Sequence, residues 1–338
     1  MRNKKKKKHE SRLSWLLYML LFALIAMYAL YGNVVVGGAA LLLLVLILIF
    51  EVKTSVSTEG AVKSAVDIGV AVGAAVIFWV LLVVLLHTSS PIDAVSSCSM
   101  LPTLHRGDLV VLHGIDNISS FISSTGVPVV SVSSAAFGSM ESNMSNEFLA
   151  YFAYFYGNMS KIAYGYAKNI TYNGIGLYST PCVSQANYLG KPSSIANCYV
   201  PANDQKHNLI KYYYSIGNLT IGNEVLGAVY TSQITVANTT ITGDSGNPIV
   251  VYQTTSRDTF SGSVIHRVYA VLNVSGRYYF LTKGDNNQAL DIEFGNYPAN
   301  QSEVLGYVVA DIPVVGYVKL LLSGQIATPA GCNETLSA

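Results

Sequence analysis

Residues Ser96–Asp108 have the sequence SSCSMLPTLHRGD and come directly after the last long apolar run of the chain. The small residues at the start of this stretch allow its backbone to approach another segment closely. Pro102 has a fixed φ and pushes the residue before it toward an extended conformation. Gly107 and Asp108 are a turn signal before an apolar segment. The stretch is therefore predicted to be a turn between two strands, at or near a membrane surface.

The composition is typical of a membrane anchor joined to an outer domain of low charge. Of the 338 residues, 51% are hydrophobic and only 12% are charged, a balance that does not suit a soluble domain. Long apolar runs occupy 13–31, 34–50 and 68–86. The first run is too long for the apolar region of a signal peptide, and the second follows almost at once. Three transmembrane helices are therefore predicted.

The net charge of +1 says little about partners, but the distribution of the lysines is informative. Lys4–Lys8 precede the first apolar run, and the polar stretch Glu51–Lys63 separates the second run from the third. Beside an apolar run, the first block is interpreted as a cytoplasmic anchor and not as a nucleic-acid-binding tail. If both stretches are cytoplasmic, every residue after His87 lies outside. No other segment is basic enough to bind nucleic acid.

From Ser89 onward, short β-like runs separated by turn signals predict a mostly β domain. Strands are predicted at 109–113, 127–132, 225–240, 248–252, 264–274, 277–283 and 304–312. A helix is predicted at 146–156, where apolar and aromatic residues do not alternate as in a strand. The apolar segment 314–322 is too short to span a bilayer, so it is expected to be a buried strand or to rest on the membrane.

The stretch Ser96–Asp108 resembles the nucleophile motif of the type I signal peptidases, S-x-S-M-x-P-T-L followed by G-D, and the family's serine falls on Ser99. A serine hydroxyl is a poor nucleophile unless a base takes its proton. His266 lies in the sequence SVIHRV, which resembles the H-R-V box of archaeal and endoplasmic-reticulum members. Those enzymes use a histidine where bacterial members use a lysine. The resemblance therefore implies that His266 is the general base.

Residues 284–291, GDNNQALD, resemble the G-D-N-N-x-x-x-D box of the same family. This resemblance makes Asp291 the carboxylate that orients His266, while Asp285 is expected to shape the turn or to add a secondary electrostatic contribution. The backbone N–H of Ser99 is expected to form the oxyanion hole, and the hydroxyl of Ser97 contributes to it in bacterial members.

The same motif supplies the expected substrate contacts, Met100 and Pro102. The position directly before Ser99 is commonly glycine in the family and is Cys98 here. A thiol beside a histidine can be catalytic, so Cys98 is an alternative nucleophile. Cys182 and Cys198 could close a short loop in an oxidising compartment or could be free thiols.

Residues 243–248, GDSGNP, offer a second alternative, because they resemble the nucleophile motif of chymotrypsin-like proteases. That fold needs an upstream A-x-H-C sequence, which no histidine here has. The segment is instead interpreted as part of a strand that resembles the family's G-D-I-V-V-F strand before the histidine.

The predicted fold is a set of N-terminal transmembrane α-helices followed by a mostly β catalytic domain of signal-peptidase type with a mixed α/β insertion. A basic tail at 1–12 precedes three helices within 13–87. The catalytic domain is assigned to 88–115 and 243–338. The interval 116–242 is predicted to be an inserted domain.

The resemblance implies a membrane-bound serine endopeptidase that removes signal peptides after small residues, at an A-x-A-like site. Its expected partners are preproteins, the lipid bilayer and the protein translocation machinery. No cofactor is implied, and no His/Cys cluster has the spacing of a metal site. The alternative is a non-catalytic surface or partner-binding protein built on a peptidase scaffold.

Overall fold

The computed structural model describes residues 2–31, 33–142, 170–172, 175–182, 187–188, 191–192, 196–201, 209–329 and 331–337. The chain divides into two compact units. The first comprises Met1–Ser97, His105–Val111 and Ala310–Ala330, and the second comprises Cys98–Leu104, Leu112–Val309 and Gly331–Ala338.

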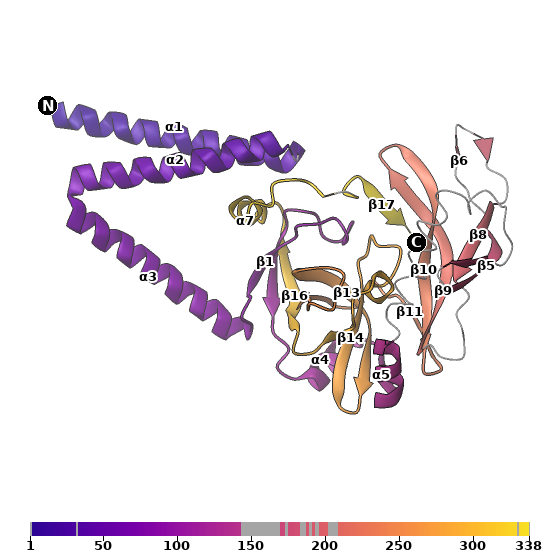
Figure 1. The fold of residues 1–338 in the computed structure, drawn as a ribbon. Coiled ribbons are helices and arrows are strands. Elements are labelled where there is room, and N and C mark those ends of the chain that lie inside the picture. The colour runs from indigo at the N-terminus through magenta and orange to yellow at the C-terminus, as the bar shows by residue number, and fades with distance from the viewer. Residues whose placement is uncertain are drawn as a thin grey trace. The chain divides into compact units, whose positions relative to one another are not determined.

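Three long helices begin the first unit: α1 (Arg2–Tyr31), α2 (Val34–Glu59) and α3 (Ala61–Leu86) (Figure 1). Each is long and apolar enough to cross a membrane. Asn33 caps α2, because its side chain accepts a hydrogen bond from the N–H of Val35 at 2.9 Å. The polar stretch predicted between the second and third spans is almost entirely helical and is broken at Gly60, where φ is +87°.

Of the two alternatives for 314–322, the buried strand is wrong, because this segment contains the short helix α7 (Tyr317–Leu322), and contact with the membrane stays a prediction. Three residues with helical spacing, Tyr317, Leu320 and Leu321, are buried in it. They belong to a cluster with Tyr28 of α1 and Ala40 of α2. A strand would place neighbouring residues on opposite faces and could not bury this set together.

Arg106 is buried in the first unit and joins α1 to the segment that follows α7. Its Nη2 atom donates to the hydroxyl of Tyr28 at 3.1 Å and to the carbonyls of Gln325 and Ala327 at 2.7 and 3.1 Å. The Tyr28 hydroxyl in turn donates to the carbonyl of Ile326 at 2.7 Å. The arginine of the H-R-G-D turn is therefore a hub of buried hydrogen bonds.

Gly107, the next residue, has a φ of +91° and lies against the ring of Tyr317. A Cβ atom at this position would overlap that ring, and the backbone conformation disfavours other residues. The glycine of the turn therefore allows α7 to pack closely.

The central sheet of the second unit has β13 (Ser263–Val274) in its middle, between β12 (Ile249–Gln253) and β14 (Arg277–Lys283). β16 (Val304–Ile312) pairs with β12, and β15 (Ala299–Asn300) pairs with β14; all these pairs are antiparallel. Within the second unit the strand order is β16, β12, β13, β14, β15, while β1 (Ile92–Ala94) forms an antiparallel pair with β2 (Leu109–His113). β3 (Val129–Val132) pairs in parallel with β13.

A second sheet has the order β11 (Thr239–Thr242), β10 (Glu224–Val236), β9 (Ile210–Ile221) and β17 (Glu334–Ser337). The single strand predicted over 225–240 is wrong, because Ala237 and Asn238 have φ values of 45° and 67° and form a two-residue hairpin turn. This conformation matches the twist of the flanking strands and divides the run into β10 and β11.

The remaining strands form two small sheets. One has the order β4 (Ile170–Tyr172), β5 (Ile175–Cys182) and β8 (Ala196–Pro201), and the other pairs β6 (Asn187–Tyr188) with β7 (Lys191–Pro192). The helix predicted at 146–156 lies outside the described residues. The side chains of Cys182, at the end of β5, and Cys198, in β8, also lie outside them.

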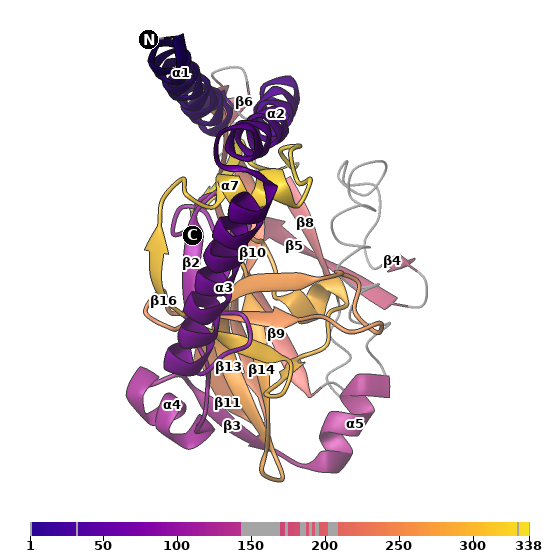
Figure 2. The same ribbon diagram turned by 90° about the vertical axis from the view of Figure 1, so that its left-hand side faces the viewer.

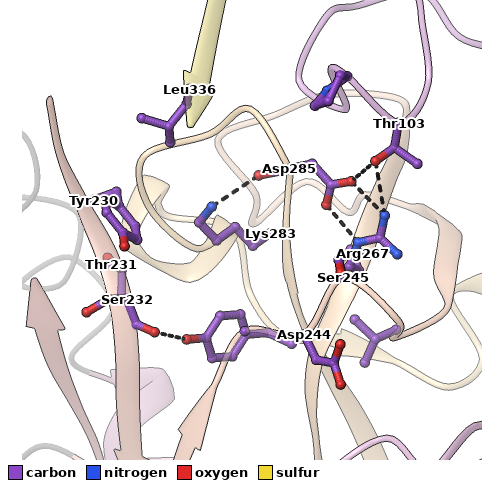
Figure 3. Close-up of a pocket in the computed structure, with 15 residues that line it drawn as sticks. Thr103, Tyr230, Thr231, Ser232, Asp244, Ser245, Arg267, Lys283, Asp285 and Leu336 are labelled. Atoms are coloured by element: carbon purple, nitrogen blue, oxygen red, sulfur yellow. Dashed lines mark hydrogen bonds and ion pairs between the residues drawn. The ribbon is translucent and has the colours of Figure 1, made fainter. Parts of the chain in front are cut away.

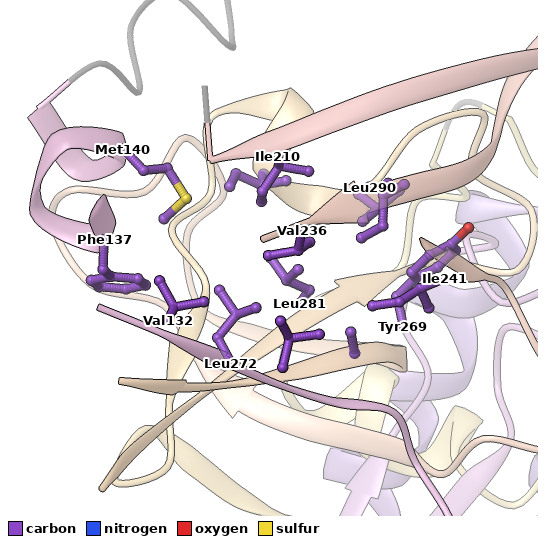
Figure 4. Packing of buried hydrophobic residues seen from close by; sticks show 14 of the residues in the cluster. Val132, Phe137, Met140, Ile210, Val236, Ile241, Tyr269, Leu272, Leu281 and Leu290 are labelled. Carbon is purple, nitrogen blue, oxygen red and sulfur yellow. The ribbon is translucent and has the colours of Figure 1, made fainter. Parts of the chain in front are cut away.

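The main core of the second unit lies where α5 (Ser134–Ser142) and both larger sheets meet (Figure 4). Phe137 of α5, Val236 of β10 and Leu272 of β13 are all buried in this cluster. In a neighbouring cluster, Phe121 of α4 (Ile118–Thr125) packs against Phe280 of β14, and Figure 2 shows α4 and α5 on either side of β3. Part of the interval predicted as an insertion thus contributes to the core, and its separability stays a prediction.

We predict that Arg106→Met lowers the apparent melting temperature of the detergent-solubilised protein by more than Tyr28→Phe. The arginine change leaves buried carbonyls without a charged donor, and hydrogen bonds to charged groups contribute about 1.5–3 kcal/mol each. The tyrosine change removes one hydroxyl, at a cost of about 1 kcal/mol. Thermal unfolding followed by intrinsic fluorescence measures both, and a larger loss in Tyr28→Phe would contradict the hub.

Candidate active site

Ser99 lies in a tight turn at residues 98–104, which is held by two buried side chains. Met100 and Leu104 are 1% and 2% exposed, and the N–H of Leu104 donates to the Met100 carbonyl at 2.9 Å. Because these residues point into the protein, the turn has a defined position and leaves Ser99 only partly buried. We call residues 98–104 the nucleophile loop.

His266 on β13 and Asp291, which begins the short 3₁₀-helix η2 (Asp291–Phe294), complete a chain of hydrogen bonds with Ser99. The Ser99 Oγ atom lies 2.9 Å from Nε2 of His266, and Nδ1 of His266 lies 2.6 Å from Oδ2 of Asp291. His266 and Asp291 are 4% and 2% exposed. This arrangement of hydroxyl, imidazole and carboxylate can activate a serine nucleophile, and the catalytic roles stay a prediction.

Two further hydroxyls bind the same oxygen of Asp291, and the sequence did not point to either. Tyr252 donates to Oδ2 at 3.0 Å and Thr282 donates at 2.6 Å. Burial and the nearby charge of Asp291 raise the pKa of Tyr252 well above its usual value, so its hydroxyl keeps its proton and acts as a donor. Tyr252 is the last residue of the strand that resembles G-D-I-V-V-F. A tyrosine in place of the family's phenylalanine is the sequence feature that could have pointed to this hydroxyl.

Asp285 lies in a separate ion pair beside the nucleophile loop. Its two carboxylate oxygens accept hydrogen bonds from Nε and Nη2 of Arg267 at 2.8 and 2.7 Å. The hydroxyl of Thr103 donates to Oδ2 at 2.6 Å. Asp285 therefore joins the residue after His266 to the nucleophile loop, which is a positioning arrangement.

The G-D-N-N turn also contacts the backbone at Ser99. The N–H of Asn286 donates to the Ser99 carbonyl at 2.7 Å. Its side-chain amide donates to the carbonyls of Cys98 at 3.1 Å and Glu334 at 2.8 Å. Gly284 lies so close that a Cβ atom there would be 2.6 Å from the Ser99 carbonyl oxygen. The turn therefore fixes the backbone on which the nucleophile is carried.

Cys98 forms a disulfide with Cys332, with a Cα–Cα distance of 5.0 Å. The alternative in which Cys98 is the nucleophile is therefore wrong for this structure, because a disulfide sulfur has no thiolate to attack with. The bond joins the nucleophile loop to the segment that leads into β17. The disulfide and the hydrogen bonds of the Asn286 side chain thus join the same two segments.

The other residues predicted for the site have different surroundings. Ser97 is exposed and belongs to the first unit, so its contribution to an oxyanion hole stays a prediction. Met100 is buried, whereas Pro102 lines a pocket. Ser245 of the GDSGNP sequence is exposed in a turn where Asp244 accepts a hydrogen bond from the N–H of Gly246 at 2.8 Å.

A pocket of about 410 Å³ lies beside the nucleophile loop (Figure 3). Its wall includes Pro102 and Thr103 of that loop, Gly284 and Asp285 of the G-D-N-N turn, and Lys283 at the end of β14. Tyrosines from β10 and β13 complete the wall. Within the described part of the chain, no group of three His, Cys, Asp or Glu side chains is placed to hold a metal ion.

Part of the chain is similar to catalytic subunits of signal peptidase complexes. The Signal peptidase complex catalytic subunit SEC11 of Verticillium alfalfae is 38% identical over 78 residues, and that of Colletotrichum graminicola is 40% identical over 80 residues. Each match covers 22% of this chain and 44% of the relative. The matched part of the chain is a signal peptidase homologue.

The similarity to signal peptidases is partial in extent, since the chain spans less than half the length of the curated relatives it matches. No family model matches the chain, and no solved structure matches it. The resemblance to the signal peptidase family is confirmed for the matched part of the chain.

We predict that Thr282→Val lowers kcat for peptide cleavage more than Tyr252→Phe. The Thr282 hydroxyl makes the shorter bond to Asp291, and its loss leaves a buried carboxylate less satisfied, a cost of about 1–3 kcal/mol. Tyr252→Phe keeps the ring in place and removes one longer bond. Steady-state kinetics on a signal-sequence peptide measure the effect. Wild-type kcat in both variants would show that neither hydroxyl positions the carboxylate.

Proposed function

We propose that this chain is a membrane-bound serine endopeptidase that removes signal peptides from preproteins. The observation that carries the proposal is the hydrogen-bonded series of Ser99, His266 and Asp291. The homology of part of the chain to signal peptidase catalytic subunits supports the same conclusion. An orienting carboxylate, a buried imidazole and a partly buried serine are the parts that such a reaction needs.

In the proposed mechanism, the Ser99 hydroxyl attacks the carbonyl carbon of the scissile peptide bond. Nε2 of His266 takes the hydroxyl proton as the new C–O bond forms, and Asp291 stabilises the imidazolium through its bond to Nδ1. The imidazolium then gives the proton to the leaving amine as the C–N bond breaks. Water hydrolyses the acyl-enzyme, with His266 again as base.

The backbone N–H of Ser99 and the hydroxyl of Ser97 are the proposed donors to the oxyanion. The side-chain amide of Asn286 donates to the Cys98 carbonyl at 3.1 Å, and this carbonyl shares a peptide unit with the Ser99 N–H, so the bond restricts how that unit can rotate. A Ser99 N–H that is already held in place needs no rearrangement when negative charge develops on the substrate carbonyl oxygen, and this lowers the barrier to the reaction.

The proposed substrates are extended segments that end in small residues at an A-x-A-like site, with Pro102 and the backbone of Met100, whose side chain is buried, among their contacts. Peptides of this kind bind by adding a strand and placing alternate side chains in pockets. Preproteins, the lipid bilayer and the protein translocation machinery are the proposed partners. No nucleic acid is among them.

The proposed membrane arrangement has three spans, with the N-terminal lysines and the Gly60 break on the cytoplasmic side. The lysines of α1 precede its apolar part, and Lys53 and Lys63 flank Gly60. With three crossings, the chain after α3 emerges on the extracytoplasmic side of the cell membrane. This is the side on which a signal peptide becomes accessible after translocation.

We predict that Ser99→Ala lowers kcat/KM on a purified preprotein by about 10³-fold or more, since it removes the attacking oxygen. His266→Ala should have a similar effect. Asp291→Asn should lower kcat more than Asp285→Asn, because Asp291 bonds to the imidazole and Asp285 bonds to Arg267. Ser99→Cys should keep part of the activity, because the same imidazole can activate a thiol.

The serine of the GDSGNP sequence is the matched control for this experiment. Ser245→Ala should retain far more cleavage than Ser99→Ala. Loss of cleavage in Ser245→Ala with full activity in Ser99→Ala would refute the assignment. A folded wild-type protein that cleaves no preprotein would favour the non-catalytic alternative.

The membrane arrangement predicts that a reporter fused after Ser90 behaves as extracytoplasmic. A fusion within the lysine block at Lys4–Lys8 should behave as cytoplasmic, because positive charge is retained on that side. A pair of reporters active on opposite sides of the membrane measures this. A cytoplasmic result at Ser90 would contradict the three-span arrangement and place the serine on the wrong side for its substrate.

A further inference from the structure

The pocket beside the nucleophile loop contains a lysine whose charge has no close carboxylate partner in the part of the chain that the structure describes. Lys283, at the end of β14, is partly buried, and its Nζ atom donates to the Gly284 carbonyl at the long distance of 3.4 Å. Among the ion pairs formed by the described residues, none includes Lys283. Figure 3 shows the side chain between Tyr230 and Asp285.

The nearby carboxylates each have other hydrogen-bond partners. Asp285 forms its two-point pair with Arg267, and Asp291 binds His266. Glu293 accepts from the Thr231 hydroxyl at 2.8 Å and from the N–H of Leu290 at 2.9 Å. These charges act on Lys283 from a distance only. Burial outweighs them and lowers the pKa of Lys283 below its usual value.

The pocket also lies within reach of a peptide bound at Ser99. Pro102 and Thr103 of its wall belong to the nucleophile loop, and Gly284 of its wall lies against the Ser99 carbonyl. At about 410 Å³, the pocket can hold a side chain with several heavy atoms. A substrate that extends from Ser99 along the nucleophile loop would therefore bring a neighbouring side chain to the pocket that Lys283 lines.

We propose that this pocket is a substrate subsite that selects an acidic side chain close to the cleaved bond, with Lys283 as the residue that binds its carboxylate. This inference rests on the proposed peptidase function. A glutamate or aspartate would give the ammonium the close anionic partner that the described residues do not supply. Because the pocket is partly shielded from water, such a pair is stronger than one on the surface.

The carboxylates on the pocket wall predict how substitutions alter the preference for an acidic substrate side chain. Asp285 is neutralised by Arg267, so Asp244 is the exposed carboxylate on the wall without an ion-pair partner among the described residues. Asp244 opposes a second carboxylate in the pocket. Removing its charge should therefore strengthen the preference for an acidic substrate.

The test uses the full-length protein in detergent and pairs of synthetic peptides with an Ala-x-Ala sequence. Within each pair, one peptide carries glutamate and the other glutamine at a single position, and the pairs cover the positions on both sides of the cleaved bond. The readout is the ratio of kcat/KM for glutamate over glutamine. A ratio of about ten at one position is expected, which corresponds to about 1.4 kcal/mol.

Lys283→Met keeps the length and apolar part of the side chain and removes its charge. It should bring the ratio close to one, whereas Asp244→Asn should raise the ratio above that of the wild type. Arg277→Met is the matched control, because it removes an exposed cation from the other end of β14 and should leave the ratio as in the wild type. A wild-type ratio near one at every position, or an unchanged ratio in Lys283→Met, would overturn the inference.

Binding separates this inference from the proposed function. Fluorescence anisotropy measures the affinity of the same labelled peptides for the Ser99→Ala protein, which needs no turnover. Tighter binding of the glutamate peptide that is lost when Lys283→Met is added supports the subsite, even if the wild type cleaves nothing and the peptidase function fails. Cleavage by the wild type together with equal binding of both peptides rejects the subsite and leaves the function intact.

Discussion

The 2.6 Å hydrogen bond between His266 and Asp291 is the interaction on which the candidate site depends. Both side chains are almost completely buried, so a carboxylate placed there without donors would be strongly unfavourable. Tyr252 and Thr282 supply those donors from β12 and β14, on either side of the histidine strand. Three adjacent strands therefore support one oxygen atom, which in turn orients the imidazole toward Ser99.

The nucleophile loop is held in place by contacts of different kinds. The hydroxyl of Thr103 donates to the carboxylate that forms the ion pair beside the loop, and the Asn286 side chain binds the loop backbone. A disulfide joins Cys98 to Cys332. None of these groups needs to take part in the chemistry. They act by limiting how far Ser99 can move from Nε2 of His266, and small displacements of reacting groups have large effects on rate.

Local patterns in the sequence predicted many of the elements and not their partners. The strands at 109–113, 277–283 and 304–312 have the predicted bounds, because alternation and turn residues act over a few positions. The prediction of one strand over 225–240 was wrong, because the hairpin turn at Ala237 and Asn238 lacks the glycine that usually marks such a turn in a sequence. The strand alternative for 314–322 was wrong because the six residues of the helix are too few for a helical period to stand out.

The sequence by itself indicated three apolar spans and a mostly β domain, from run length and alternation, and it offered Ser99, His266 and Asp291 as candidate site residues through motif resemblance. Only the tertiary structure decided which residues meet. Ser99 and His266 are 167 positions apart, and Cys98 and Cys332 are 234 apart. The hydroxyls on Asp291 and the partly buried position of the Lys283 ammonium likewise depend on strand register and burial. A sequence pattern does not contain these quantities, because they arise when distant segments pack together.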